Sequence, residues 1–155
     1  IKSFLMKNRS MVEIGGIISV IGSLVFVGVE ISQNTAAVRG ATQYAVSGQI
    51  TEMYRIVAEN EKIASIMSQA YKGIHKSDLS ETDYTRFWLF SSMGFRRVEN
   101  IHLQYKNGLL SEEAFERIGM AFYRTPLVRE IWEKDKEAYN PGFVTFFENL
   151  RDGEK

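Results

Sequence analysis

The residue pair that comes closest to a catalytic or metal-binding motif is Glu99-x-x-His102. Helical bundles that bind two metal ions use a glutamate and a histidine at this spacing, because both side chains then lie on one helix face. Such a site needs a second pair, and the other histidine, His75, follows Lys72 where an acidic residue would be required. We therefore predict no metal site and interpret His102 as a buried, hydrogen-bonded histidine.

The remaining reactive groups form no catalytic constellation. The 155 residues contain no cysteine, which excludes disulfides, thiolate metal sites and cysteine nucleophiles. No serine lies in a nucleophile-elbow context, and no glycine-rich loop links a strand to a helix. The 19 basic and 19 acidic side chains cancel, which argues against a general nucleic-acid binder. We predict no catalytic residue, no cofactor and no nucleic-acid partner.

Polar side chains interrupt the apolar pattern of the segment that carries Glu99. Arg96, Glu99, His102 and Tyr105 are candidate anchors for a ligand or a partner, since they lie within three turns of one predicted helix. The alternative is a solvated arginine–glutamate pair, which contributes little when exposed. A third hypothesis, an enzyme of unrecognised type, would require a cavity with a perturbed Glu99 or His102.

A run of sixteen residues without charge, positions 14–29, is the sharpest compositional feature of the chain. As a helix, residues 11–31 would span about 31 Å, and the hydrocarbon core of a bilayer is about 30 Å thick. We predict a transmembrane helix over 11–31. A cleaved secretory signal and a buried core helix are the alternatives; Glu30 fits the first poorly, and the missing polar face fits the second poorly.

Small residues recur along this segment at Gly15, Ser19, Gly22 and Ser23. Spacing by four places Gly15, Ser19 and Ser23 on one face, where small side chains allow membrane helices to approach closely. These residues are therefore candidate helix-packing positions, although glycine and serine are also common in membrane helices generally.

The rest of the chain reads as a series of helices. Apolar positions after residue 31 keep a helical period, so the first helix is expected to continue to about Ala58. Capping residues then predict helices over 61–72, 81–107, 112–123, 126–139 and 141–150. They begin at Asn60, Ser80, Ser111, Thr125 and Asn140. We predict an all-α protein in which a transmembrane helix continues into a compact bundle of about five helices.

This reading divides the chain into four parts. A basic arm covers residues 1–10, the transmembrane helix 11–31, a helical extension 32–58 and a soluble helical domain 59–155. Aromatic residues are frequent in the last forty positions, and most are expected in the core. Phe143, Phe146 and Phe147 are alternatively a patch that faces a partner.

The segment Gly28–Arg39, with Gln33, Asn34 and Thr35 at its centre, resembles a family of uncharacterised bacterial proteins. Its members have one N-terminal apolar helix, a Gln-Asn-Thr junction and a small helical domain. Tyr105-x-x-Gly108-Leu109-Leu110 is a second match, whereas Ser32 stands where that family often has a basic residue. The resemblance implies a bacterial origin and a membrane anchor, and it implies no activity.

Three basic residues, Lys2, Lys7 and Arg9, precede the apolar run, and only Arg39 follows it closely. The positive-inside rule then places the N-terminus in the cytoplasm and the helical domain in the periplasm, at the bacterial inner membrane. We expect a membrane-anchored structural or interaction protein whose partners are the lipid bilayer and other membrane proteins or copies of itself. A membrane-tethered module that senses or binds a small ligand is the alternative.

Overall fold

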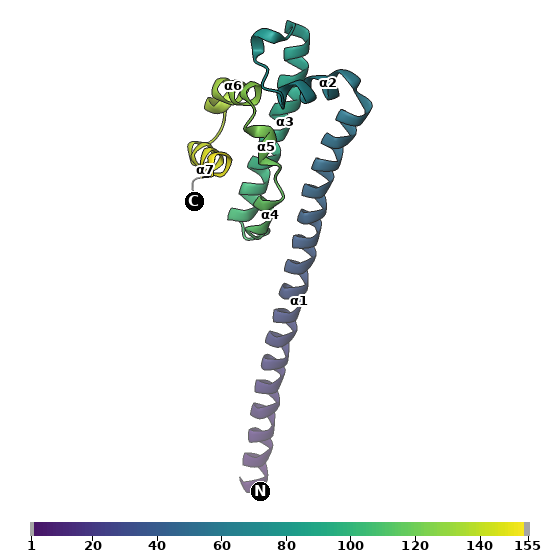
Figure 1. The fold of residues 1–155 in the computed structure, drawn as a ribbon. Coiled ribbons are helices and arrows are strands. Elements are labelled where there is room, and N and C mark those ends of the chain that lie inside the picture. The colour runs from purple at the N-terminus through teal and green to yellow at the C-terminus, as the bar shows by residue number, and fades with distance from the viewer. Residues whose placement is uncertain (1, 154–155) are drawn as a thin grey trace. The chain divides into compact units, whose positions relative to one another are not determined.

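The structure is a computed structural model that describes the backbone of residues 2–153 and the side chains of residues 13–153. Every regular element in this range is helical, as predicted. The basic arm, residues 1–10, lies outside the described side chains. Figure 1 follows the chain through its α-helices. Their bounds are α1 Lys2–Glu59, α2 Glu61–Ala70, α3 Glu81–Lys106, α4 Glu113–Glu116, α5 Met120–Tyr123, α6 Pro126–Asp135 and α7 Pro141–Asp152, with 3₁₀ turns η1 Lys76–Asp78 and η2 Lys136–Ala138.

The chain divides into two compact units, Ile1–Ala41 and Thr42–Lys155. Within its described part the first unit is a single helix, so it has no core of its own. The second unit contains the end of α1 and all later helices. Its core includes Met53 of α1, with Val46, Ile50, Ile56 and Val57 packed against it. Residues 42–58, expected to form an extension outside the domain, are therefore grouped with it.

Local capping explains where several helices begin. The Asn60 side chain accepts a hydrogen bond from the Ile63 amide at 3.1 Å and separates α1 from α2. Ser80 accepts one from the Asp83 amide at 3.2 Å at the start of α3. The reciprocal bond of a capping box is replaced there by an ion pair between Asp83 and Lys62 of α2, at 3.0 Å.

Two expected helices are shorter than predicted. The segment 112–123 breaks into α4 and α5, because Gly119 adopts a non-helical conformation with φ −69° and ψ 77°. The helix that begins at Pro126 ends at Asp135 and continues as the turn η2. Thr125 does not cap it through its side chain: the hydroxyl instead donates back to the Phe122 carbonyl at 2.9 Å.

Helix α3 is central to the second unit and contacts α2, α6 and α7 (Figure 1). Its fully buried residues include Phe87, Phe95, Val98 and Ile101. Gly94 on the same face is required by a close contact, because a Cβ there would lie 2.8 Å from the Tyr123 hydroxyl and 3.3 Å from the terminal methyl of Met53. The missing side chain therefore lets α5 and the end of α1 approach α3.

We expect Gly94→Ala to destabilise the protein by about 1–3 kcal/mol, the usual cost of overpacking a core. Gly40→Ala is the matched control, since a Cβ there meets nothing within 4 Å and alanine favours the helix. Tyr123→Phe removes the clashing oxygen and should recover part of the loss in the double variant. Chemical denaturation followed by circular dichroism measures all four free energies of unfolding. A Gly94→Ala variant as stable as Gly40→Ala would contradict the contact.

Candidate functional site

A groove of about 510 Å³ lies on the second unit, between the last third of α1 and the middle of α3. Its walls come from two helices that the core holds together through Met53. The lining residues are Ala45, Gly48, Gln49, Glu52, Met53, Met93, Arg96 and Arg97. Half of these residues are small or apolar, and the charged groups are two adjacent arginines and one glutamate. The groove therefore combines an apolar wall with a small number of charged groups.

Arg97 is the unusual member of this set, because it is charged and only 7% exposed. Its Nε atom is buried without a hydrogen-bond partner, and the residue makes no ion pair with any side chain in the described range. Burial lowers the pKa of Arg97, an effect that the nearby phenols of Tyr123 and Tyr54 oppose. A guanidinium nevertheless stays protonated in proteins, so Arg97 is a buried cation without a counter-charge.

Arg96, one of the predicted anchors, is exposed and already contacts two residues of the chain. It donates to Glu99 at 2.7 Å, and its guanidinium carbon lies 4.0 Å from the centre of the Tyr139 ring. The hydrogen bond to Glu99 raises the pKa of Arg96. These two contacts fix Arg96 at the groove, whereas Glu99 serves as its partner.

The carboxylate that lines the groove, that of Glu52, is also hydrogen-bonded to another residue. Arg55 donates to both of its oxygens, at 2.9 and 2.5 Å, and to Glu59 as well. The hydrogen bond from Arg55 lowers the pKa of Glu52. Glu52 therefore does not neutralise Arg97, although both residues line the same groove.

His102 and Tyr105 lie in a different environment from Arg96. The His102 ring stacks on Phe146 with centroids 4.1 Å apart and is tilted against Phe143 at 5.8 Å. Its Nδ1 atom is buried and has no hydrogen-bond partner, which contradicts the expected hydrogen-bonded histidine. Tyr105 packs edge-on against Phe115 at 5.0 Å. The four predicted anchors thus do not converge on one site.

The three phenylalanines of α7 belong largely to the core, as expected for most aromatic residues in this part of the chain. Phe143 is 2% exposed and Phe147 is fully buried, so neither ring is available on the surface of this chain. Phe146 is half-buried between His102 and Phe115, the latter at 4.9 Å. The partner-facing interpretation is therefore wrong for Phe143 and Phe147, because α7 turns them towards α3 and α6.

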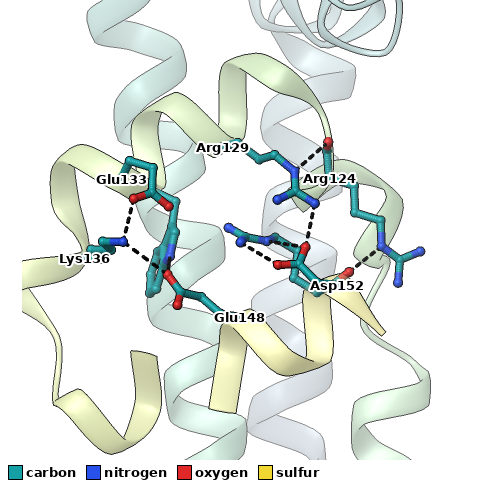
Figure 2. Close-up of polar contacts among 8 residues, drawn as sticks. Arg124, Arg129, Glu133, Lys136, Glu148 and Asp152 are labelled. Atoms are coloured by element: carbon teal, nitrogen blue, oxygen red, sulfur yellow. Dashed lines mark hydrogen bonds and ion pairs between the residues drawn. The ribbon is translucent and has the colours of Figure 1, made fainter. Parts of the chain in front are cut away.

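A network of charged groups fastens α7 to α6 (Figure 2). Asp152 accepts hydrogen bonds from Arg129 at 2.6 Å and from Arg151 at 3.0 and 2.9 Å. These arginines hold the pKa of Asp152 down at about 2, with Arg151 the larger influence. Arg124 donates to the Arg151 backbone carbonyl at 2.5 Å. Arg151 is buried like Arg97, but it has an acidic partner.

The second half of this network surrounds an indole. Glu148 of α7 accepts a hydrogen bond from Trp132 Nε1 at 2.9 Å and lies 3.5 Å from Lys136. Lys136 also pairs with Glu133 at 2.5 Å (Figure 2). The network therefore supports the packing of the two helices, and its acidic residues, Glu133, Glu148 and Asp152, do not line the groove.

The predicted helix-packing positions lie on α1 within the first unit. Ser19 donates to the Gly15 carbonyl at 2.8 Å, and Ser23 donates to the Ser19 carbonyl at 2.9 Å. A Cβ on Gly22 would meet nothing within 4 Å. Both hydroxyls are thus satisfied inside the helix, which leaves a low and nearly apolar face.

Within the described residues, no three histidine or acidic side chains gather into a group that could hold a metal ion. Glu99, half of the motif that suggested such a site, pairs instead with Arg96 at 2.7 Å.

Arg97 is not among the four anchors that the sequence pattern suggested, although it lies beside Arg96 in the same polar stretch. A signal was present: Phe90, Gly94 and Ile101 are buried positions spaced from Arg97 by seven, three and four residues. A position on this stripe faces the core in a regular helix. An arginine that interrupts an apolar stripe is therefore a candidate buried charge.

These features define an all-α protein with one long apolar helix and a small helical domain that carries a groove with a buried arginine. The chain matches no known protein family, no curated protein and no solved structure. The likeness of the Gln33-Asn34-Thr35 junction to bacterial membrane-anchored proteins stays a prediction.

The two histidines are expected to titrate in opposite directions from their ordinary value of about 6.5. The hydrogen bond between His75 Nδ1 and Glu130, at 2.5 Å, raises the pKa of His75. Burial lowers the pKa of His102, and Lys106 adds to this effect. A proton NMR titration of the two imidazole signals measures both values, and Glu130→Gln should lower only that of His75.

The same shifts fix the sign of the pH dependence of stability. The His75–Glu130 pair stabilises the fold at pH values below the unfolded-state pKa and loses that contribution as the pH rises through the raised value. His102 acts oppositely, since its contribution is present above the unfolded-state pKa and is lost as the pH falls through the lowered value. The same titration midpoint for the two imidazole signals would contradict these assignments.

Proposed function

We propose that this chain is a single-pass protein of the bacterial inner membrane whose helical domain acts through contacts with other membrane proteins or further copies of itself. The observation that carries the proposal is the apolar part of α1. This helix contains a window with a mean hydropathy of 2.2, long enough to cross a bilayer. Ile17, Leu24 and Phe26 are 60–69% exposed along it.

Exposed apolar side chains on this scale are unfavourable in water. Each fully exposed aliphatic or aromatic side chain costs about 1.5–3 kcal/mol relative to an apolar environment. A lipid bilayer supplies that environment on every side of the helix, and the backbone hydrogen bonds are already satisfied within it. The basic residues Lys2, Lys7 and Arg9 before the span favour a cytoplasmic N-terminus and a periplasmic domain.

Membrane insertion and orientation can be tested by cysteine labelling, because the chain has no cysteine of its own. We expect an impermeant maleimide to label Ser68→Cys in intact spheroplasts and to label Ser3→Cys only after lysis. Ser23→Cys, within the span, is the matched control and should react only after denaturation. The reverse pattern would overturn the orientation. A chain released from membranes by alkaline carbonate would overturn the anchor.

Self-association is expected to depend on the small-residue face. Ser19→Leu and Ser23→Leu add bulk where two helices would approach, and such contacts contribute about 1–2 kcal/mol, or roughly a tenfold change in association. Leu24→Phe adds apolar volume on the other side of the helix and is the control. The mass of the intact particle in mild detergent reports the result. Unchanged particles in both serine variants would contradict this packing face.

A second function, binding of a small ligand by the tethered domain, is supported by the groove and its unpaired Arg97. The two functions differ in what accompanies the purified protein. A subunit of a complex co-purifies with other polypeptides, whereas a ligand-binding module shows a small molecule by mass spectrometry under native conditions.

A further inference from the structure

We propose that the groove between residues 45–53 of α1 and residues 93–97 of α3 binds an aliphatic monocarboxylate, with Arg97 as the anchor of its head group. The inference gives the second function above a ligand class. It concerns the helical domain alone, so a failure to bind the ligand would not contradict the membrane anchor or the partner contacts.

Arg97 carries a positive charge that no described side chain pairs with. Arg97 is 7% exposed, lines the groove, and has no ion pair with any residue the structure describes. A buried ion without a counter-charge is strongly unfavourable, and proteins that keep one normally pair it or place it where a ligand supplies the opposite charge. The neighbouring side chains of Tyr54 and Tyr123 are phenols and not carboxylates, so they do not supply it.

Among the residues that the structure describes, no acidic side chain near the groove is free to pair with Arg97. Glu52 is held by Arg55 at 2.5 and 2.9 Å, and Glu99 is held by Arg96 at 2.7 Å. Both acids have exposed arginines as partners, while the buried arginine has none. No described acidic side chain therefore supplies the counter-charge for Arg97, which a bound anion would provide.

The walls of the groove are apolar beside Arg97. Ala45, Gly48, Met53 and Met93 form an apolar surface beside Arg97, and methionine adapts readily to the shape of an aliphatic chain. The volume of about 510 Å³ lies in the range of small-molecule sites. A ligand that complements both the arginine and the apolar wall has an anionic head and an apolar body.

The choice of a monocarboxylate over a phosphate follows from Glu52. A carboxylate matches the planar guanidinium fork in a bidentate contact. Glu52 places a negative charge on the same groove and disfavours a dianion such as free phosphate. A single negative charge on an aliphatic chain meets both conditions.

The test uses the full chain in non-ionic detergent with hexanoate as the probe. We expect hexanoate to shift the Nε–Hε NMR signal of Arg97 saturably and to raise the thermal midpoint. That signal is identified as the one absent from Arg97→Lys. 1-Hexanol, which has the same chain without charge, should leave the signal unmoved. Inorganic phosphate should bind more weakly than hexanoate.

Two arginine variants separate a ligand anchor from a structural residue. Arg97→Met should weaken hexanoate binding by about ten- to a hundredfold, the loss expected for a charge-assisted contact. Its ligand-free thermal midpoint should match or exceed that of the parent, because a buried unpaired charge is removed. Arg86→Met, on the exposed side of the same helix, is the control and should bind hexanoate normally.

Several results would overturn the proposal. Equal responses to hexanoate and 1-hexanol would show partitioning without charge recognition, and tighter binding of phosphate would overturn the ligand class. Undiminished hexanoate binding by Arg97→Met would make Arg97 structural. If Arg97→Met fails to fold, Arg97→Lys keeps the charge without the fork, and hexanoate affinity equal to the parent's in that variant would overturn the anchor role.

Discussion

The packing of Phe95, Trp132 and Phe147 is the constraint on which the helical domain depends. All three are fully buried, and their ring centroids lie 5.0 Å apart for Phe95 and Trp132 and 4.4 Å apart for Trp132 and Phe147. They come from α3, α6 and α7, so one cluster joins helices far apart in the sequence. Each such side chain contributes about 1.5–3 kcal/mol by burial, and each aromatic pair about 0.5–1.5 kcal/mol more.

This cluster sets the positions of the groups around it. The Trp132 indole needs a hydrogen-bond acceptor, and Glu148 supplies it at 2.9 Å. The Phe95 ring also packs edge-on against Tyr139, with ring centroids 6.5 Å apart. The guanidinium of Arg96 lies over the Tyr139 ring. Beside Phe95 on α3, the close approach at Gly94 brings in Met53 and Tyr123. Arg97 follows Gly94 by three residues, so the same packing buries its charge beside the groove.

Helix α1 meets two physical requirements along its length. Residues 14–29 carry no charge and form a helix without a core in the first unit. Residues 42–59 contribute Met53 and its half-buried neighbours to the core of the second unit. The first segment is exposed within its own unit, whereas the second packs against apolar side chains of the domain.

Local sequence accounts for the helical class, the apolar run and the starts of most helices, because capping at Asn60, Ser80 and Asn140 acts within one turn. It did not determine where the domain begins, the burial of Arg97 and Phe143, or the separation of Arg96 from His102. Periodicity shows which residues share a helix face. Which face is covered, and by which helix, depends on docking between segments far apart in the chain, and a local pattern does not encode such contacts.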